Sequence, residues 1–225
     1  MTPQPNPPVT IGDSHRTYTS LAETAIREMV LDGRLAPGAR LNEVVLAHTL
    51  QISRGPLREA IQRLASQGLL QVVSHRGAFV RSFGRDELAD LYDLRIALET
   101  HAVRVGVQRA TDGEIAELRE VLEATQRILA SRPSRYPSDL DFHRRLVELA
   151  HNPVITAAFA SALVQIGLAR SRSSSDPARA RVALADHLEV LTHVVERDGH
   201  RAAASLRRHL EGALANALTV LELVP

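Results

Sequence analysis

The chain has 225 residues, of which 44% are hydrophobic and only 3% aromatic, and it contains no cysteine. This length allows two modest domains with aliphatic cores, and the lack of cysteine excludes disulfides and thiolate metal sites. No apolar run reaches the length of about 18 residues that a membrane span needs. The proline-rich start lacks the pattern of a signal peptide, so we expect a cytoplasmic protein with no membrane contact.

The charge is unevenly distributed along the chain, although the net charge is only +1. Residues 1–84 carry 9 arginines and 6 acidic residues, a net +3, whereas residues 85–225 carry 18 and 20, a net −2. A mildly basic first part and an acidic second part favour contact with nucleic acid through the first part alone.

The order of predicted elements favours a winged helix-turn-helix near the N-terminus. We expect residues 1–16 to be a disordered arm and residues 17–32 to form a first helix, with Leu21 and Ile26 facing inward. A helix with Asn42 as N-cap should follow, then a tight turn and a second helix with Ser53 as N-cap. Two β-prone runs at residues 69–74 and 78–81, separated by a short turn that contains a glycine, complete the predicted domain at residues 17–83.

The second helix of this motif has two distinct faces. Leu57, Ile61 and Leu64 recur at helical spacing and should be buried. Arg54, Arg58 and Gln62 are four residues apart on another face without an acidic residue, which suits base edges and phosphates in a major groove. The alternative is an ordinary amphipathic helix whose arginines are simply solvated.

Residues 84–225 show helical patterns only. Six helices with short turns are predicted, typical of an antiparallel bundle. On the first of them, we expect the inner side to carry Leu88, Leu91, Leu94, Leu98 and Val105. The predicted fold is therefore mostly α, with an N-terminal winged helix-turn-helix followed by an all-α antiparallel helical bundle.

The motifs of the first part resemble the GntR family of regulators. The similar runs are Gly33–Glu43, Ile52–Ala60, Gly68–Leu70 and Arg76–Val80. The resemblance implies a homodimer on a palindromic double-stranded DNA operator, with Arg54 and Arg58 in contact with the operator and the wing tip at Arg76 and Gly77 in the minor groove. Together with the neighbouring positions on the second helix, the expected DNA-binding residues are Ser53, Arg54, Arg58, Gln62, Arg76 and Gly77. One departure is Val44, which stands where some members have a DNA-reading arginine, so that contact is absent or replaced here.

The second part resembles the FCD effector domain of the FadR-like branch, and it contains a polar cluster. Asp139 and His143 are four residues apart on one face of a predicted helix. His187 and His209 lie at similar distances on either side of the turn at residues 198–199, so a helical hairpin would bring them to one level. Such a group in an aliphatic core favours a divalent metal, first Zn and otherwise Ni or Mn. The resemblance implies the same four ligands.

Arg95 lies one helical turn before Glu99 on the first bundle helix. One interpretation is a simple salt bridge between these two residues. The other, which the resemblance supports, is a guanidinium that holds the carboxylate of a small effector.

These patterns predict a metabolite-responsive DNA-binding transcription regulator and not an enzyme, and the family resemblance favours a repressor. The alternatives are a regulator that senses the metal directly and, less favoured, a metal-dependent hydrolase. Against the hydrolase, no general acid or base lies near the cluster in the sequence except Asp141 and Glu148, and neither follows the helical spacing of the ligands.

Overall fold

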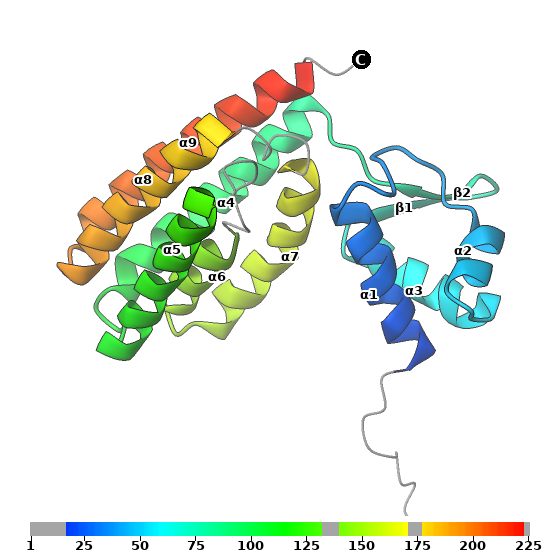
Figure 1. Ribbon diagram of the computed structural model, residues 1–225, viewed down its shortest axis with the longest axis horizontal. Coiled ribbons are helices and arrows are strands. Elements are labelled where there is room, and N and C mark those ends of the chain that lie inside the picture. Colours follow the sequence, from blue (N-terminus) through cyan, green and yellow to red (C-terminus); the bar gives the residue numbers. More distant parts are fainter. Residues whose placement is uncertain (1–16, 132–139, 171–176, 223–225) are drawn as a thin grey trace, which may run out of the picture.

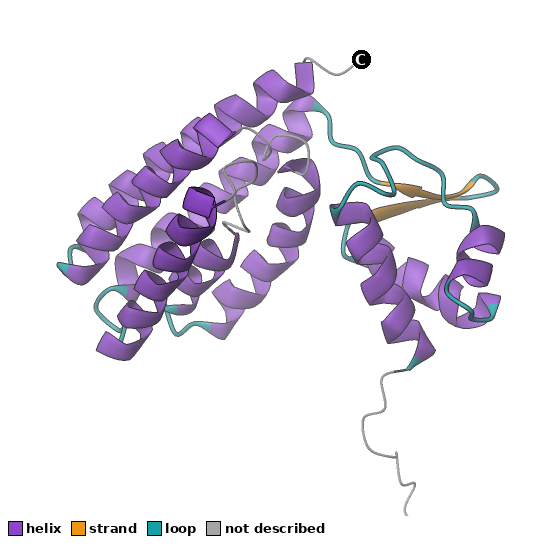
Figure 2. Cartoon of the chain, viewed as in Figure 1, coloured by secondary structure: helices purple, strands orange, loops and turns teal. Residues whose placement is uncertain are grey.

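The computed structural model describes residues 17–131, 140–170 and 177–222, and helices dominate it (Figures 1 and 2). Its first part contains α1 (Tyr18–Leu31), α2 (Glu43–Thr49), α3 (Arg54–Ser66), β1 (Leu70–Val73) and β2 (Gly77–Val80). The second part contains α4 (Arg85–Gly106), α5 (Asp112–Ser131), α6 (Leu140–Glu148), α7 (Pro153–Arg170), α8 (Pro177–Val195) and α9 (Gly199–Glu222). This order confirms the predicted fold class. Within the described ranges, no helix is both long and apolar enough to cross a membrane.

The helix-turn-helix forms where the sequence predicts it. α2 starts after Asn42, whose Oδ1 accepts hydrogen bonds from the backbone N–H groups of Val44 and Val45 at 3.1 and 3.2 Å. α3 starts after Ser53, as predicted, but the Ser53 side chain makes no cap hydrogen bond. The predicted role of its hydroxyl as a helix cap is therefore wrong, although the boundary is right.

The wing is a two-stranded antiparallel hairpin. Leu70 pairs with Val80 at its base and Val73 pairs with Gly77 near its tip. Gly77 has a backbone φ of +99°, which residues with a Cβ rarely adopt. Glycine is therefore favoured at this position, where the chain turns back. The first part thus combines α1, α2 and α3 with one β-hairpin (Figure 1).

Two residues that the apolar spacing places inside are exposed. Leu21 is 44% exposed because the buried stripe of α1, which packs on α3, runs through the adjacent Ala22 instead. Leu94 is 46% exposed because the fully buried side chains of Arg95 and Glu99 occupy the inner face of α4. A polar pair therefore occupies part of the helix face that the pattern assigns to leucines.

Helix α7 belongs to both parts of the molecule. Near its C-terminal end, Leu168 is 1% exposed and lies in the same apolar cluster as the cores of α1, α3 and the wing. One turn earlier, Gln165 accepts a hydrogen bond from Arg81 Nη1 at 2.8 Å. Nearer its N-terminal end, the buried Phe159 packs into a cluster with residues of α4 and α6. Helix α7 thus packs against both the bundle and the winged domain (Figure 1), and Leu91 of α4 also packs against the winged-domain cluster.

Candidate metal centre and nucleic-acid interface

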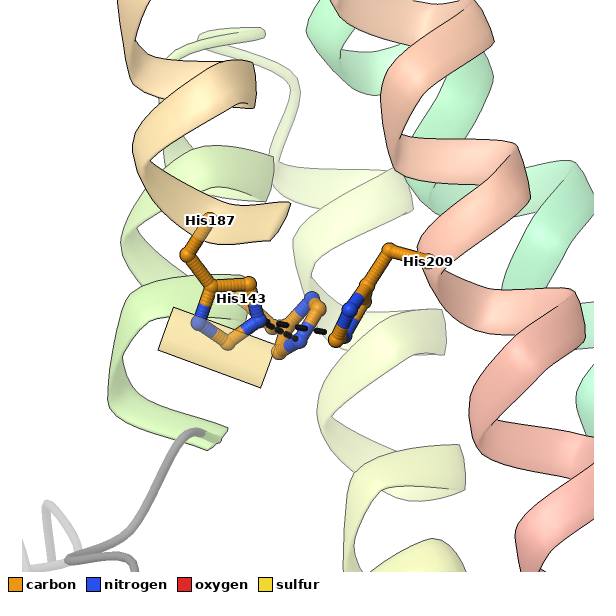
Figure 3. A group of neighbouring side chains, drawn as sticks. All are labelled: His143, His187 and His209. Atoms are coloured by element: carbon orange, nitrogen blue, oxygen red, sulfur yellow. Dashed lines mark hydrogen bonds between the residues drawn. The ribbon is translucent and has the colours of Figure 1, made fainter. Parts of the chain in front are cut away.

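Three histidines from three helices meet inside the bundle. His143 comes from α6, His187 from α8 and His209 from α9, and their rings point toward one another (Figure 3). Nε2 of His187 lies 3.2 Å from Nε2 of His143 and 3.0 Å from Nε2 of His209. All three side chains are buried. The structure therefore brings together three of the four predicted ligands, while Asp139 lies outside the described residues.

Two carboxylates hold the outer nitrogens of these rings. Glu99 Oε2 lies 2.6 Å from Nδ1 of His143, and Asp186 Oδ2 lies 3.0 Å from Nδ1 of His209. An imidazole that donates Nδ1–H to a carboxylate keeps its Nε2 lone pair for another partner. Sequence reasoning missed both supports, although Asp186 directly precedes His187.

The three inner nitrogens fit a bound cation. With the protons of His143 and His209 on Nδ1, their Nε2 atoms are acceptors that both face Nε2 of His187. The three inner nitrogens thus lie within hydrogen-bonding distance of one another and can supply lone pairs to a shared cation. A metal about 2.0–2.1 Å from each nitrogen keeps its ligand nitrogens roughly 3 Å apart. The observed separations match this arrangement, and the donor set suits a divalent transition metal.

Arg95 extends the cluster as a fully buried cation. Its Nε donates to Glu99 Oε1 at 2.6 Å, and its guanidinium carbon lies 5.6 Å from the centre of the Tyr92 ring. Among the residues that the structure describes, its Nη1 and Nη2 have no hydrogen-bond partner. Burying a guanidinium whose donors make no hydrogen bond is costly. The Nη1 and Nη2 groups of Arg95 could therefore donate to a bound anion.

The charge states in this chain of contacts follow from burial and proximity. Burial opposes ionisation of Glu99, but the charge of Arg95 and the contact with His143 lower its pKa to about 2. Burial lowers the pKa of His143 to about 4, although Glu99 acts in the opposite direction. At neutral pH, Glu99 is therefore an anion and His143 a neutral imidazole, the form that binds metals.

The predicted reading surface lies on the exposed side of α3. Leu57, Ile61 and Leu64 are buried, as the spacing predicts. The side chains that the sequence assigns to DNA are exposed on the same helix or at its start, namely Ser53, Arg54, Arg58 and Gln62. At the wing, Arg76 is exposed beside Gly77, and on α2 Val44 is 57% exposed.

One acidic residue contacts this surface, contrary to the sequence pattern. Glu43, the first residue of α2, accepts a hydrogen bond from Arg58 Nε through Oε2 at 2.8 Å. The spacing within α3 cannot reveal this pair, because the partner lies 15 residues earlier on another helix. The arginine face of α3 is therefore not free of acid.

Comparison with known proteins agrees with this architecture. Residues 18–80 match the family model of the bacterial regulatory proteins of the gntR family, and residues 90–212 match the FCD domain model. The Nta operon transcriptional regulator of Aminobacter aminovorans is 37% identical over 184 residues, covering 81% of this chain and 86% of that protein. The HTH-type transcriptional repressor NanR of Klebsiella aerogenes is 26% identical, covering 92% of this chain and 90% of that protein.

A solved structure shares the fold. The E. coli McbR/YncC structure has a TM-score of 0.75 at 24% identity and covers 91% of this chain and 99% of its own. The named relatives are transcription regulators, so the hydrolase alternative is set aside. By its two matched domains and its 37% identical relative, the chain belongs to the GntR family of bacterial transcription regulators, in which it pairs a helix-turn-helix with an FCD domain.

Proposed function

We propose that this regulator is a metabolite-responsive repressor that binds a palindromic operator as a homodimer and holds a divalent metal in its bundle. The observation that carries the proposal is the buried group of His143, His187 and His209, whose Nε2 atoms converge. Imidazole nitrogens that converge in a buried site are a donor set that suits a divalent transition metal. That a relative is named a repressor supports the direction of control.

The metal would be held by these three imidazoles, with Asp139 as a fourth ligand. Nitrogen ligands and one carboxylate suit Zn best and also fit Ni or Mn. Glu99 and Asp186 would fix the ring orientations from behind. When bound, the metal would supply a Lewis-acid position for an anionic ligand.

The effector would be a small carboxylate held by Arg95. Its Nη1 and Nη2 are buried and lack partners among the described residues. A guanidinium with two parallel N–H donors matches a carboxylate in a bidentate pair. Because Glu99 contacts both Arg95 and His143, a ligand at the guanidinium would also affect the histidine cluster.

A route from this site to the DNA-binding part is provided by α7. The helix packs on α6, which carries His143, and it inserts Leu168 into the winged-domain core. We propose that effector binding shifts α7 and thereby the angle at which the two helix-turn-helix units of a dimer meet DNA. Two half-sites about 10 base pairs apart would be contacted by Arg54 and Arg58 on α3 and by Arg76 at the wing.

The test uses duplex DNA selected by the full-length protein from a random pool. The affinity of the protein for this duplex would be measured in the chelated and the Zn-loaded state, with and without a panel of small carboxylates. We expect acids to weaken DNA binding only when the metal is present, and Arg95→Met to remove the response. Sedimentation should give a particle of twice the 24.6 kDa chain mass. If no acid changes the affinity in either state, the effector proposal fails.

A second candidate function is direct metal sensing. It is favoured by the three-histidine group, because all three converging imidazole nitrogens belong to the protein itself. In the same titration, a metal sensor would change its DNA affinity with the metal alone, and added carboxylates would have no further effect.

A further inference from the structure

We infer that Glu43 is a specificity-determining residue for DNA, because it positions the Arg58 guanidinium and disfavours binding to unrelated sequences. The inference rests on the proposed role of Arg58 in reading DNA. The contact joins Arg58 Nε to Glu43 Oε2 at 2.8 Å, and the two side chains are 66% and 28% exposed. Glu43 therefore lies at the surface that α3 would present to a DNA groove.

The acidic partner is the better fixed of the two. Glu43 is the first residue of α2, directly after Asn42, whose side chain caps the helix through two backbone N–H groups. Leu46 of α2 and Leu57 of α3 lie in one buried cluster, which fixes the helices relative to each other. A short side chain on a fixed backbone thus holds a long side chain that would otherwise sample many rotamers.

The contact uses one donor of the guanidinium and leaves the others. Glu43 accepts from Nε, and no other partner of Arg58 occurs among the residues that the structure describes. The terminal nitrogens Nη1 and Nη2 can therefore form the bidentate pair with O6 and N7 of guanine, the commonest specific arginine contact in the major groove. Holding Nε beforehand reduces the freedom that Arg58 loses when it binds the base.

The same carboxylate opposes binding to DNA of any sequence. A negative charge at the reading surface repels phosphates, and phosphate attraction supplies nearly all non-specific affinity. Glu43 should therefore weaken binding to random DNA but strengthen binding to DNA that has a guanine at the position that Arg58 contacts. An exposed ion pair with a merely structural role would change neither the affinity for random DNA nor the affinity for the preferred sequence by much.

The experiment compares full-length wild type, Glu43→Ala, Glu43→Gln and Arg58→Ala by selection from a random duplex pool. Affinities are then measured for the selected duplex and for a shuffled duplex. For Glu43→Ala, we expect about threefold tighter binding to the shuffled duplex and about threefold weaker binding to the selected one. The base preference should be lost at the position that Arg58→Ala also loses. Glu43→Gln keeps an oxygen for Nε but no charge, so it should bind the shuffled duplex more tightly and retain the preference.

A matched control is Glu28→Ala, which removes one acidic charge from an exposed position on α1 and should leave the base preference unchanged. A thermal melt of each variant confirms folding. The inference is overturned if Glu43→Ala selects the wild-type sequence, or if its two affinities fall by the same factor. It also fails if Arg58→Ala retains the wild-type preference. A wild type that selects no sequence at all would instead contradict the proposed function itself.

Discussion

Replacing Glu99 with glutamine removes one negative charge from the buried cluster and keeps the shape of the side chain. Glu99 is 0% exposed, accepts from Arg95 Nε at 2.6 Å and contacts Nδ1 of His143 at 2.6 Å. The amide oxygen of Glu99→Gln can replace one of these contacts. It cannot neutralise Arg95, so a buried guanidinium is left without a counter-charge.

The expected loss of stability can be obtained in two ways. Removing one partner of a buried ion pair costs about 3–5 kcal/mol of unfolding free energy. The lowering of the Glu99 pKa from its ordinary 4.5 to about 2 corresponds to about 3 kcal/mol. For a chain of this size, each kcal/mol lowers the melting temperature by roughly 2–4 °C. We therefore expect a decrease of about 6–20 °C in the metal-free protein.

Urea and thermal unfolding of chelated, full-length protein would measure this loss. Arg95→Met and the double variant with Glu99→Gln complete a double-mutant cycle, and the double variant should lose less than the sum of the single losses. Glu120→Gln on the exposed side of α5 is the matched control and should change stability by less than about 0.5 kcal/mol. A loss below about 1 kcal/mol for Glu99→Gln, or additive single effects, would refute the reasoning.

Three further perturbations test other parts of the molecule. Gly68→Ala should cost about 1–2 kcal/mol in urea unfolding, because Gly68 has φ +76° and a Cβ there would lie 2.7 Å from Gln165 Cδ; an unchanged midpoint would contradict this packing. Backbone and side-chain hydrogen bonds from Thr111 and His151 lower the pKa of Glu114 to about 2. Since the pKa of Glu114 is lower in the folded than in the unfolded state, its ionised form stabilises the fold above pH 4.5, and this stabilisation is lost as the pH falls toward 2. Glu114→Gln should therefore flatten the pH–stability curve between these two values. Chelation of Zn-loaded protein should lower stability by about 2.7 kcal/mol if the free metal was at a hundredfold excess over Kd, and equal melting curves would argue against the metal.

Local patterns predict the fold well because they involve neighbours in the chain. The cap at Asn42 and the buried stripe of Leu57 and Ile61 depend on residues within one or two turns, and both are found in the structure. The meeting of His187 and His209 is also nearly local, because a short turn joins α8 and α9 and places the two rings at one level. Such features need no knowledge of the tertiary fold.

The missed residues all act across long separations in the chain. Glu99 contacts His143 across 44 residues, and Asp186 contacts His209 across 23. Helical spacing states which face a side chain occupies, but it does not state which helix packs against that face. The same limitation explains Leu94, since the apolar pattern gives no reason for a buried cation and carboxylate to displace a leucine from the inner side of α4.

In the proposed regulation, α7 is the helix through which a ligand in the bundle would affect DNA binding. Leu168 belongs to the winged-domain core and Phe159 to the bundle core, so the helix cannot move without repacking one of them. Tightly packed cores switch between discrete arrangements and do not deform smoothly. A ligand would therefore change the relative populations of two packings, by no more than its difference in affinity for them. Two contacts of α7 could carry this coupling, the buried packing of Leu168 and the partly exposed hydrogen bond between Arg81 and Gln165. Leu168 is the better candidate, because loss of its apolar contact would open a cavity. Water can replace the hydrogen bond, so its loss would cost less.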